Sequence, residues 1–150
     1  MTPDHIILHH SFTKDGKEVN YNAIKRYHVE TLGWRDIGYH VIIEDQRGMV
    51  NALFGRMLNE SGAHTKQRGM NNRSIGICMV GNFDIAEPSS QIWNLALRLC
   101  RSFMDIYGIA DEKVQGHREY ASYKSCPGNL FDLGKFRYFL KNLKEVYEVP

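Results

Sequence analysis

Short apolar runs and longer amphipathic stretches alternate along this chain, and they predict alternating strands and helices. Residues 45–48, Asp-Gln-Arg-Gly, are typical of a turn between two antiparallel strands. A polar loop is expected at 13–17, and a longer loop at 59–73, where Gly and Asn are frequent and no periodicity is visible. Long loops in compact domains often carry function. The strands are expected at 6–9, 39–44, 49–53, 74–80 and 113–116.

Three helices are expected where apolar residues recur at three- and four-residue spacing. The first follows a cap at Asn20 and ends at Gly33, and the second runs from Pro88-Ser89-Ser90 to Gly108. The third follows a cap at Asp132. The second helix is expected to turn Ile92, Leu95, Leu99, Phe103 and Ile106 toward the core, and the third Phe136, Phe139, Leu140 and Leu143.

Strands with helices between them predict an α/β fold: a single three-layer domain over residues 1–150, with a mixed central β-sheet flanked by helices. The apolar content of 43% and charged content of 24% are ordinary for a globular domain of this length. A formal net charge of +2 is too small to indicate nucleic acid. The sequence has no apolar stretch of the roughly 18 residues that a membrane span needs. We therefore expect no nucleic-acid or membrane partner, and a monomer.

The start of the chain lacks the basic segment, apolar segment and cleavage site of a secretory signal. The three cysteines have no disulfide-framework spacing, so cytoplasmic synthesis is expected. Cys78 and Cys100 lie in an apolar strand and an apolar helix face, where core packing is their default role. Cys126 lies in a polar loop near Lys124, whose ammonium group would favour the thiolate, the form that binds metal.

Three residues that are far apart in the sequence are candidate ligands for zinc. They are one histidine of the His9–His10 pair at the end of the first strand, His117 after the last strand, and Cys126 nine residues further on. Three protein ligands leave the fourth tetrahedral position of zinc for water, as in catalytic sites. Successive strand residues point to opposite faces, so only one histidine of the pair can face the metal, and spacing does not choose between them. Each of the three could also be a packing residue.

Seven motifs in one order resemble the zinc-dependent N-acetylmuramoyl-L-alanine amidases, the family of bacteriophage amidase-type lysozymes and animal peptidoglycan recognition proteins. The resemblance covers nearly the whole chain and is closest to the small phage enzymes. The motifs are Ile-Leu-His-His-Ser at 7–11, Gly-Trp-Arg-Asp-Ile-Gly-Tyr-His at 33–40, Gly-Ala-His at 62–64, Asn71 with Ser-Ile-Gly-Ile at 74–77, Val-Gly at 80–81, Gly-His-Arg at 116–118 and Cys-Pro-Gly at 126–128.

The resemblance implies one Zn²⁺ ion held by His9, His117 and Cys126, and it selects His9 from the histidine pair. The interval from His117 to Cys126 is one residue longer than in the phage enzymes, which indicates a different local loop geometry. The implied reaction is hydrolysis of the amide bond between N-acetylmuramic acid and L-alanine in peptidoglycan. The implied role is cell-wall lysis by a phage or prophage endolysin that reaches the wall by a separate route.

Two further residues take roles from the resemblance, and two more are candidates for contact with substrate. The resemblance implies that Tyr39 and Lys124 are catalytic, whereas His64 and Asn71 are candidate substrate contacts because of their place in the long loop. A zinc ion lowers the pKa of bound water toward about 7. A lysine ammonium group can stabilise the charge that develops on the attacked carbonyl oxygen. Tyr39 would hold the water or pass a proton; it could equally be a half-buried strand residue, Lys124 a solvated lysine, and Asn71 a cap of its loop.

The sequence is also compatible with two other functions. One is a non-catalytic peptidoglycan-binding or regulatory module on the same fold, and some phage relatives also bind an RNA polymerase, so such a partner is possible by analogy only. The other is a glycosidase, which usually needs two carboxylates placed on either side of the scissile bond. No acidic pair stands out from the surface charge of this sequence, so the glycosidase is the weaker candidate.

Overall fold

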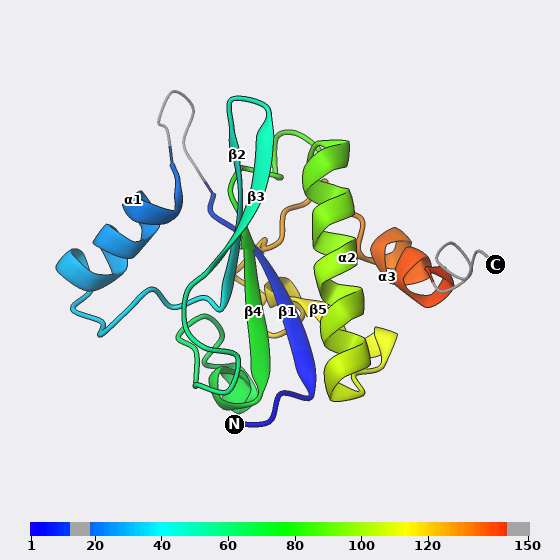
Figure 1. Cartoon of the computed structure of the whole chain (residues 1–150), viewed down its shortest axis with the longest axis horizontal. Coiled ribbons are helices and arrows are strands. Elements are labelled where there is room, and N and C mark those ends of the chain that lie inside the picture. The colour runs from blue at the N-terminus through cyan, green and yellow to red at the C-terminus, as the bar shows by residue number, and fades with distance from the viewer. Residues whose placement is uncertain (13–18, 144–150) are drawn as a thin grey trace.

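A five-stranded β-sheet lies between two helical layers in the computed structural model, which describes residues 1–12 and 19–143 (Figure 1). Helix α1 (Tyr21–Arg26) covers one face of the sheet, and α2 (Ser90–Tyr107) and α3 (Leu133–Asn142) lie on the other. The predicted three-layer α/β domain with a mixed sheet is therefore confirmed. The loop expected at 13–17 lies outside the described residues.

The sheet has the strand order β3-β2-β4-β1-β5. Strands β1, β2, β4 and β5 run parallel, and β3 pairs antiparallel with β2. The carboxyl ends of the four parallel strands therefore meet at one edge, where ligand sites of open α/β sheets lie. The strands are β1 (His5–His10), β2 (Val41–Gln46), β3 (Met49–Phe54), β4 (Ser74–Met79) and β5 (Val114–Gly116).

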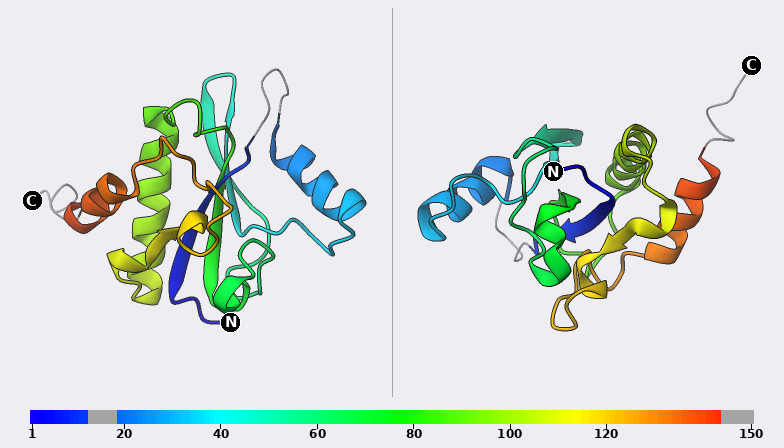
Figure 2. Two further views of the ribbon diagram at one scale, coloured as in Figure 1. Left: turned by 180° about the vertical axis from the view of Figure 1, so that it is seen from behind. Right: turned by 90° about the horizontal axis from the view of Figure 1, so that it is seen from below.

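Alternation along the strands produces two cores, one on each face of the sheet. Leu8 and Ile77 belong to the larger core, which packs against α2 and α3. Ile42 and Cys78 belong to the smaller core, which packs against α1. His9 follows Leu8 and pairs with Cys78 in the parallel ladder, so its side chain lies on the α1 face. The second view of Figure 2 shows the two helical layers on either side of the strands.

The first predicted helix and the predicted long loop differ in detail from the structure. Asn20 caps α1 by accepting a hydrogen bond from the Ala23 N–H, but after Arg26 the chain continues as the π-helix η1 (Tyr27–Thr31). The loop at 59–73 contains the 3-10 turn η2 (Gln67–Asn72). At the midpoint of this turn, Arg68 and Gly69 have positive φ angles of 52° and 68°. Such a short irregular turn leaves no apolar periodicity in the sequence, so the sequence could not predict it. Two more 3-10 turns are η3 (Asp111–Lys113) and η4 (His117–Glu119).

Helix α2 begins and ends as predicted, with the Ser89 side chain as its cap and Gly108 in the left-handed conformation at φ 67°. Its buried face is rotated from the predicted one, because its buried residues include Ala96, Leu97, Cys100 and Met104. Ile106 is 66% exposed, so its predicted place in the core was wrong. No helix in the part of the chain described here is long and apolar enough to cross a membrane.

Helix α3 follows its predicted cap, because the Asp132 side chain accepts a hydrogen bond from the Lys135 N–H. Leu133, Phe136 and Leu140 are buried against α2 and the sheet. Phe139 is 39% exposed, so its predicted core position was wrong. The helix buries a narrow stripe only, and Phe139 lies beside that stripe, with its ring 5.9 Å from the ring of Tyr138.

Candidate active site

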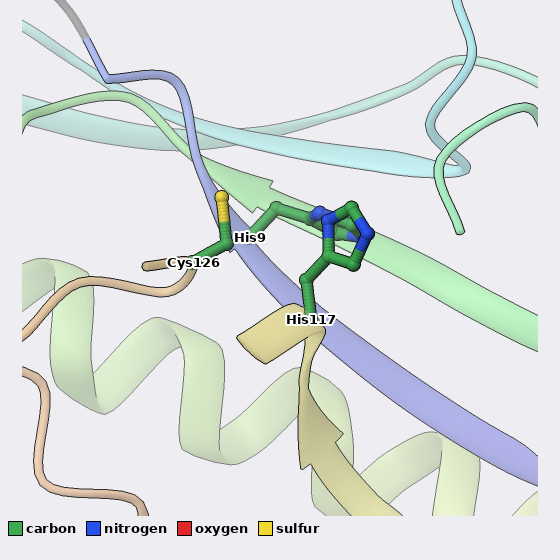
Figure 3. Close-up of side chains that lie close together, drawn as sticks. All are labelled: His9, His117 and Cys126. Atoms are coloured by element: carbon green, nitrogen blue, oxygen red, sulfur yellow. The ribbon is translucent and has the colours of Figure 1, made fainter. Parts of the chain in front are cut away.

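Three side chains from distant parts of the sequence meet at the carboxyl edge of the sheet. His9 comes from β1, His117 from η4 directly after β5, and Cys126 from the loop that follows, and Figure 3 shows them gathered at one point. Their possible ligand atoms all lie within 4.8 Å of one another. A tetrahedral zinc ion with two nitrogen ligands and one sulfur ligand needs separations of about 3.3–3.6 Å. Small side-chain movements would therefore bring the three atoms to one ion.

His10 faces away from this cluster, as strand alternation predicts. Its Nδ1 accepts a hydrogen bond from the Phe83 N–H at 3.0 Å, and its Nε2 lies 3.4 Å from Ser125 Oγ. The Ser125 hydroxyl donates to a carboxylate oxygen of Asp84 at 2.8 Å. His10 therefore helps to hold the loop that carries Cys126, and His9 is the histidine of the pair that lies in the cluster with His117 and Cys126.

The loop of Cys126 is held from a second side by Arg118. The backbone N–H of Arg118 donates to the Cys126 carbonyl oxygen at 2.8 Å, and its guanidinium group donates to the carbonyl oxygens of Gly128 and Phe131. Arg118 follows His117 directly, so one short segment supplies one candidate ligand and also positions the loop that carries another. These hydrogen bonds help to hold the Cys126 thiol next to the two imidazoles.

The two imidazoles have the neutral form that binds metal. Burial and, to a smaller extent, the nearby Lys124 ammonium group lower the pKa of His117 to about 4. Burial also holds the pKa of His9 well below its ordinary value. Burial raises the pKa of the Cys126 thiol, and Lys124 opposes this only in part. The prediction that Lys124 favours the thiolate was right in direction, but burial has the larger effect, so the thiol would lose its proton on binding a metal.

Tyr39 and Lys124 both lie near the three candidate ligands. The Tyr39 ring centre is 5.2 Å from that of His9. Burial raises the pKa of Tyr39 well above its ordinary value, so its hydroxyl group is a neutral donor at physiological pH. Lys124 lines a cleft of about 490 Å³ that also reaches His117. The structure thus brings both predicted catalytic residues to the cluster. The neighbouring His40 is fully buried and hydrogen-bonded to backbone groups, which is a structural role.

His64 and Asn71 also lie in the wall of this cleft. The Asn71 side-chain oxygen accepts hydrogen bonds from the backbone N–H groups of His64 and Thr65, both at 2.7 Å, so Asn71 caps its loop. The His64 side chain is 8% exposed, and its Nδ1 lies 3.0 Å from His9 Nε2. His64 therefore packs against the candidate ligand His9, and Asn71 holds the backbone of His64 in place. Contact of either residue with substrate stays a prediction.

The sequence reasoning missed Gln67, which lies in the 3-10 turn η2. Its side-chain oxygen is 3.4 Å from His117 Nε2, and its amide nitrogen donates to the Tyr123 hydroxyl at 2.8 Å. A polar residue in an irregular loop has no periodicity or motif that could have singled it out. Only the folding of the loop against the segment after β5 brings Gln67 to a candidate ligand.

Gly76 in β4 leaves the space that the His64 ring fills. A Cβ atom at Gly76 would lie 2.5 Å from two ring carbons of His64, closer than real Cβ contacts come. We expect Gly76→Ala to lower the free energy of unfolding by about 1–3 kcal/mol, as overpacking does, in urea denaturation. Gly134→Ala is the matched control, because its nearest neighbouring atom would be 3.4 Å away and it lies in helix α3. That change should be neutral or stabilising by up to about 1 kcal/mol. Equal stability of the two variants would contradict the packing described here.

Comparison with known proteins agrees with this geometry. The family model described as N-acetylmuramoyl-L-alanine amidase matches residues 1–129. This chain belongs to the N-acetylmuramoyl-L-alanine amidase family. The endolysin of Enterobacteria phage T3 is 42% identical over 141 residues, which are 90% of this chain and 85% of the relative. The endolysin of Escherichia phage T7 is 35% identical over 139 residues, or 89% and 84% of the two chains. The chain is accordingly an amidase.

The solved structures extend the likeness to the fold. The N-acetylmuramoyl-L-alanine amidase LysC from Clostridium intestinale superposes with a TM-score of 0.81 at 28% identity, covering 93% of this chain and 86% of that chain. Drosophila PGRP-LB superposes with a TM-score of 0.72 at 28% identity, covering 87% and 79%. Both the amidase and the peptidoglycan recognition branches of the predicted resemblance are therefore confirmed as relatives.

Proposed function

We propose that this amidase is zinc-dependent, that it cleaves the amide bond between N-acetylmuramic acid and L-alanine in peptidoglycan, and that it serves as an endolysin. The cluster of His9, His117 and Cys126 carries the proposal, because these are the ligand types and the number of ligands of a catalytic zinc site. Similarity to two phage endolysins over most of the chain supports the substrate and the role. A point mutant of Drosophila PGRP-LB, a structural relative, has been solved in complex with tracheal cytotoxin.

The three residues fit a zinc ion by their chemistry as well as their distances. Two imidazoles that burial keeps neutral and one thiol form a donor set that suits zinc. When bound, zinc polarises a carbonyl group and lowers the pKa of a coordinated water. The cleft beside His117 is open to substrate, so an amide carbonyl can approach the ligands from that side.

The residues around the ligands supply the remaining groups of an amide hydrolysis. The Lys124 ammonium group lies in the cleft next to His117, where it can stabilise negative charge on the carbonyl oxygen of the substrate. Tyr39 is held neutral by burial, and its hydroxyl group can orient the attacking water or donate to the leaving amine. The Asn71 side-chain oxygen is engaged in its own loop, which leaves its amide nitrogen for a substrate carbonyl.

A product assay on purified peptidoglycan tests this function. We expect new N-terminal alanine without new reducing sugar, because the amide bond and not a glycosidic bond is cleaved. Dialysis against a chelator should abolish the release of alanine, and a stoichiometric addition of Zn²⁺ should restore it. New reducing sugar would indicate a glycosidase. Sedimentation with insoluble peptidoglycan but no product would indicate a binding module. Full activity of metal-free protein would exclude the zinc mechanism.

A further inference from the structure

The imidazole of His64 packs against the imidazole of His9 and fits closely among its neighbours. A Cβ atom at Gly62 or at Gly76 would lie 2.5 Å from this ring, so both positions need glycine for the ring to fit. The backbone N–H of His64 is fixed by its hydrogen bond to Asn71 at 2.7 Å. The ring is thus confined by two glycine positions and its backbone is anchored, although His64 lies within an irregular loop.

The hydrogen bonds of His64 determine which ring nitrogen carries its proton. Nε2 of His64 lies 3.4 Å from the Ser74 carbonyl oxygen, which can only accept a hydrogen bond. The neutral ring therefore has its proton on Nε2, and its Nδ1 is an acceptor. That acceptor lies 3.0 Å from His9 Nε2 and 3.1 Å from the Thr65 hydroxyl group.

We propose that His64 is a positioning residue for His9: it accepts a hydrogen bond from the His9 Nε2–H and so leaves His9 Nδ1 to bind the metal. The inference rests on the proposed zinc site. Histidine ligands usually donate their second ring N–H to a carboxylate, a carbonyl or a water, which fixes the tautomer and the ring orientation. Here the acceptor is a second imidazole. A neutral acceptor fixes His9 without adding negative charge next to the metal.

The second histidine ligand shows the same arrangement in a weaker form. Nε2 of His117 lies 3.4 Å from the side-chain oxygen of Gln67, so Nδ1 is again the nitrogen left for the metal. Gln67 is only half-buried, and its own partner, the hydroxyl group of Tyr123, belongs to a side chain that is 70% exposed. The buried His64 is the stiffer support, so its loss should weaken zinc binding more than the loss of Gln67.

Zinc affinity of the metal-free protein, measured by competition with a chromophoric chelator, tests the proposal. His64→Leu fills much of the space but removes the acceptor, and we expect it to weaken Zn²⁺ binding about 10–100-fold. His64→Gln keeps an acceptor oxygen and should recover part of that loss. With Co²⁺ in place of zinc, the visible spectrum of His64→Leu should differ from that of the wild type, because the orientation of a ligand ring changes.

His28→Gln is the matched control. His28 is also 8% exposed and accepts a backbone hydrogen bond, from the Gly38 N–H at 3.0 Å, but it does not contact a candidate ligand. We expect this variant to lose stability and to keep its zinc affinity. An affinity of His64→Leu within about threefold of the wild type would overturn the proposal.

NMR of the wild-type protein gives an answer that does not depend on the folding of any variant. In the metal-free protein the His9 ring should carry its proton on Nε2, with a cross-hydrogen-bond coupling to His64 Nδ1. A proton on His9 Nδ1 would overturn the inference. If the wild type binds no zinc but shows the expected tautomer, the proposed zinc function fails while the hydrogen bond to His64 stands, so the two failures can be told apart.

Discussion

Cys126→Ser is expected to lower the rate of alanine release from peptidoglycan by about three orders of magnitude or more. The hydroxyl group of serine is a poor ligand for zinc, and the two remaining imidazoles cannot hold the ion at working concentrations. His117→Ala should have the same effect, because it removes a ligand that the structure holds within 4.8 Å of the other two. Release of alanine, followed by chromatography after amine labelling, measures the rate, and zinc content by mass spectrometry shows the lost metal.

Cys100→Ala is the control for a general effect of losing a cysteine. Cys100 is fully buried in α2 and packs in the larger core, away from the candidate ligands. Its replacement should lower the melting temperature and leave alanine release per folded molecule unchanged. Cys126→Ser should show the opposite pattern when both are measured without metal: a melting temperature close to that of the wild type and no activity. A Cys126→Ser protein that keeps both zinc and activity would exclude Cys126 as a ligand.

Lys124→Ala is expected to lower kcat by about 100- to 1,000-fold, the range for removing one group that stabilises a developing oxyanion. Lys124 lies in the cleft beside His117, and its positive charge contributes, after burial, to the lowered pKa of this candidate ligand. Its role is in the transition state, so zinc affinity and KM should change much less than kcat. Steady-state kinetics on a soluble muropeptide separate the two parameters.

Lys66→Ala provides the matched comparison, since Lys66 lines the same cleft and carries the same charge. It is not among the groups whose charge shifts the pKa of His9, His117 or Cys126, whereas Lys124 shifts the pKa of all three. Its loss should affect substrate binding alone and leave kcat within about threefold of the wild type. Equal losses of kcat in the two variants would mean that the cleft needs only its overall positive charge.

The sequence by itself determined the layers of the fold and much of the chemistry. Apolar periodicity predicted five strands and three helices, and local signals such as the Ser89 cap and Gly108 set the ends of α2, because such interactions involve neighbours in the chain. Motif order predicted the family and, through it, the ligands His9, His117 and Cys126. Strand alternation further established that His9 and His10 face opposite ways, but it did not say which one faces the metal.

Only the tertiary structure decided which residues support those ligands. His64 reaches His9 across 55 positions of sequence, and Gln67 reaches His117 across 50, and no local pattern encodes contacts between an irregular loop and a strand end. The exposure of Ile106 and Phe139 was likewise missed, because helix periodicity gives an apolar stripe but not its rotation against the sheet. The rotation of a helix against a sheet depends on where small side chains such as Ala96 allow close packing. It is therefore set by the helix and the sheet together and cannot be derived from the helix sequence alone.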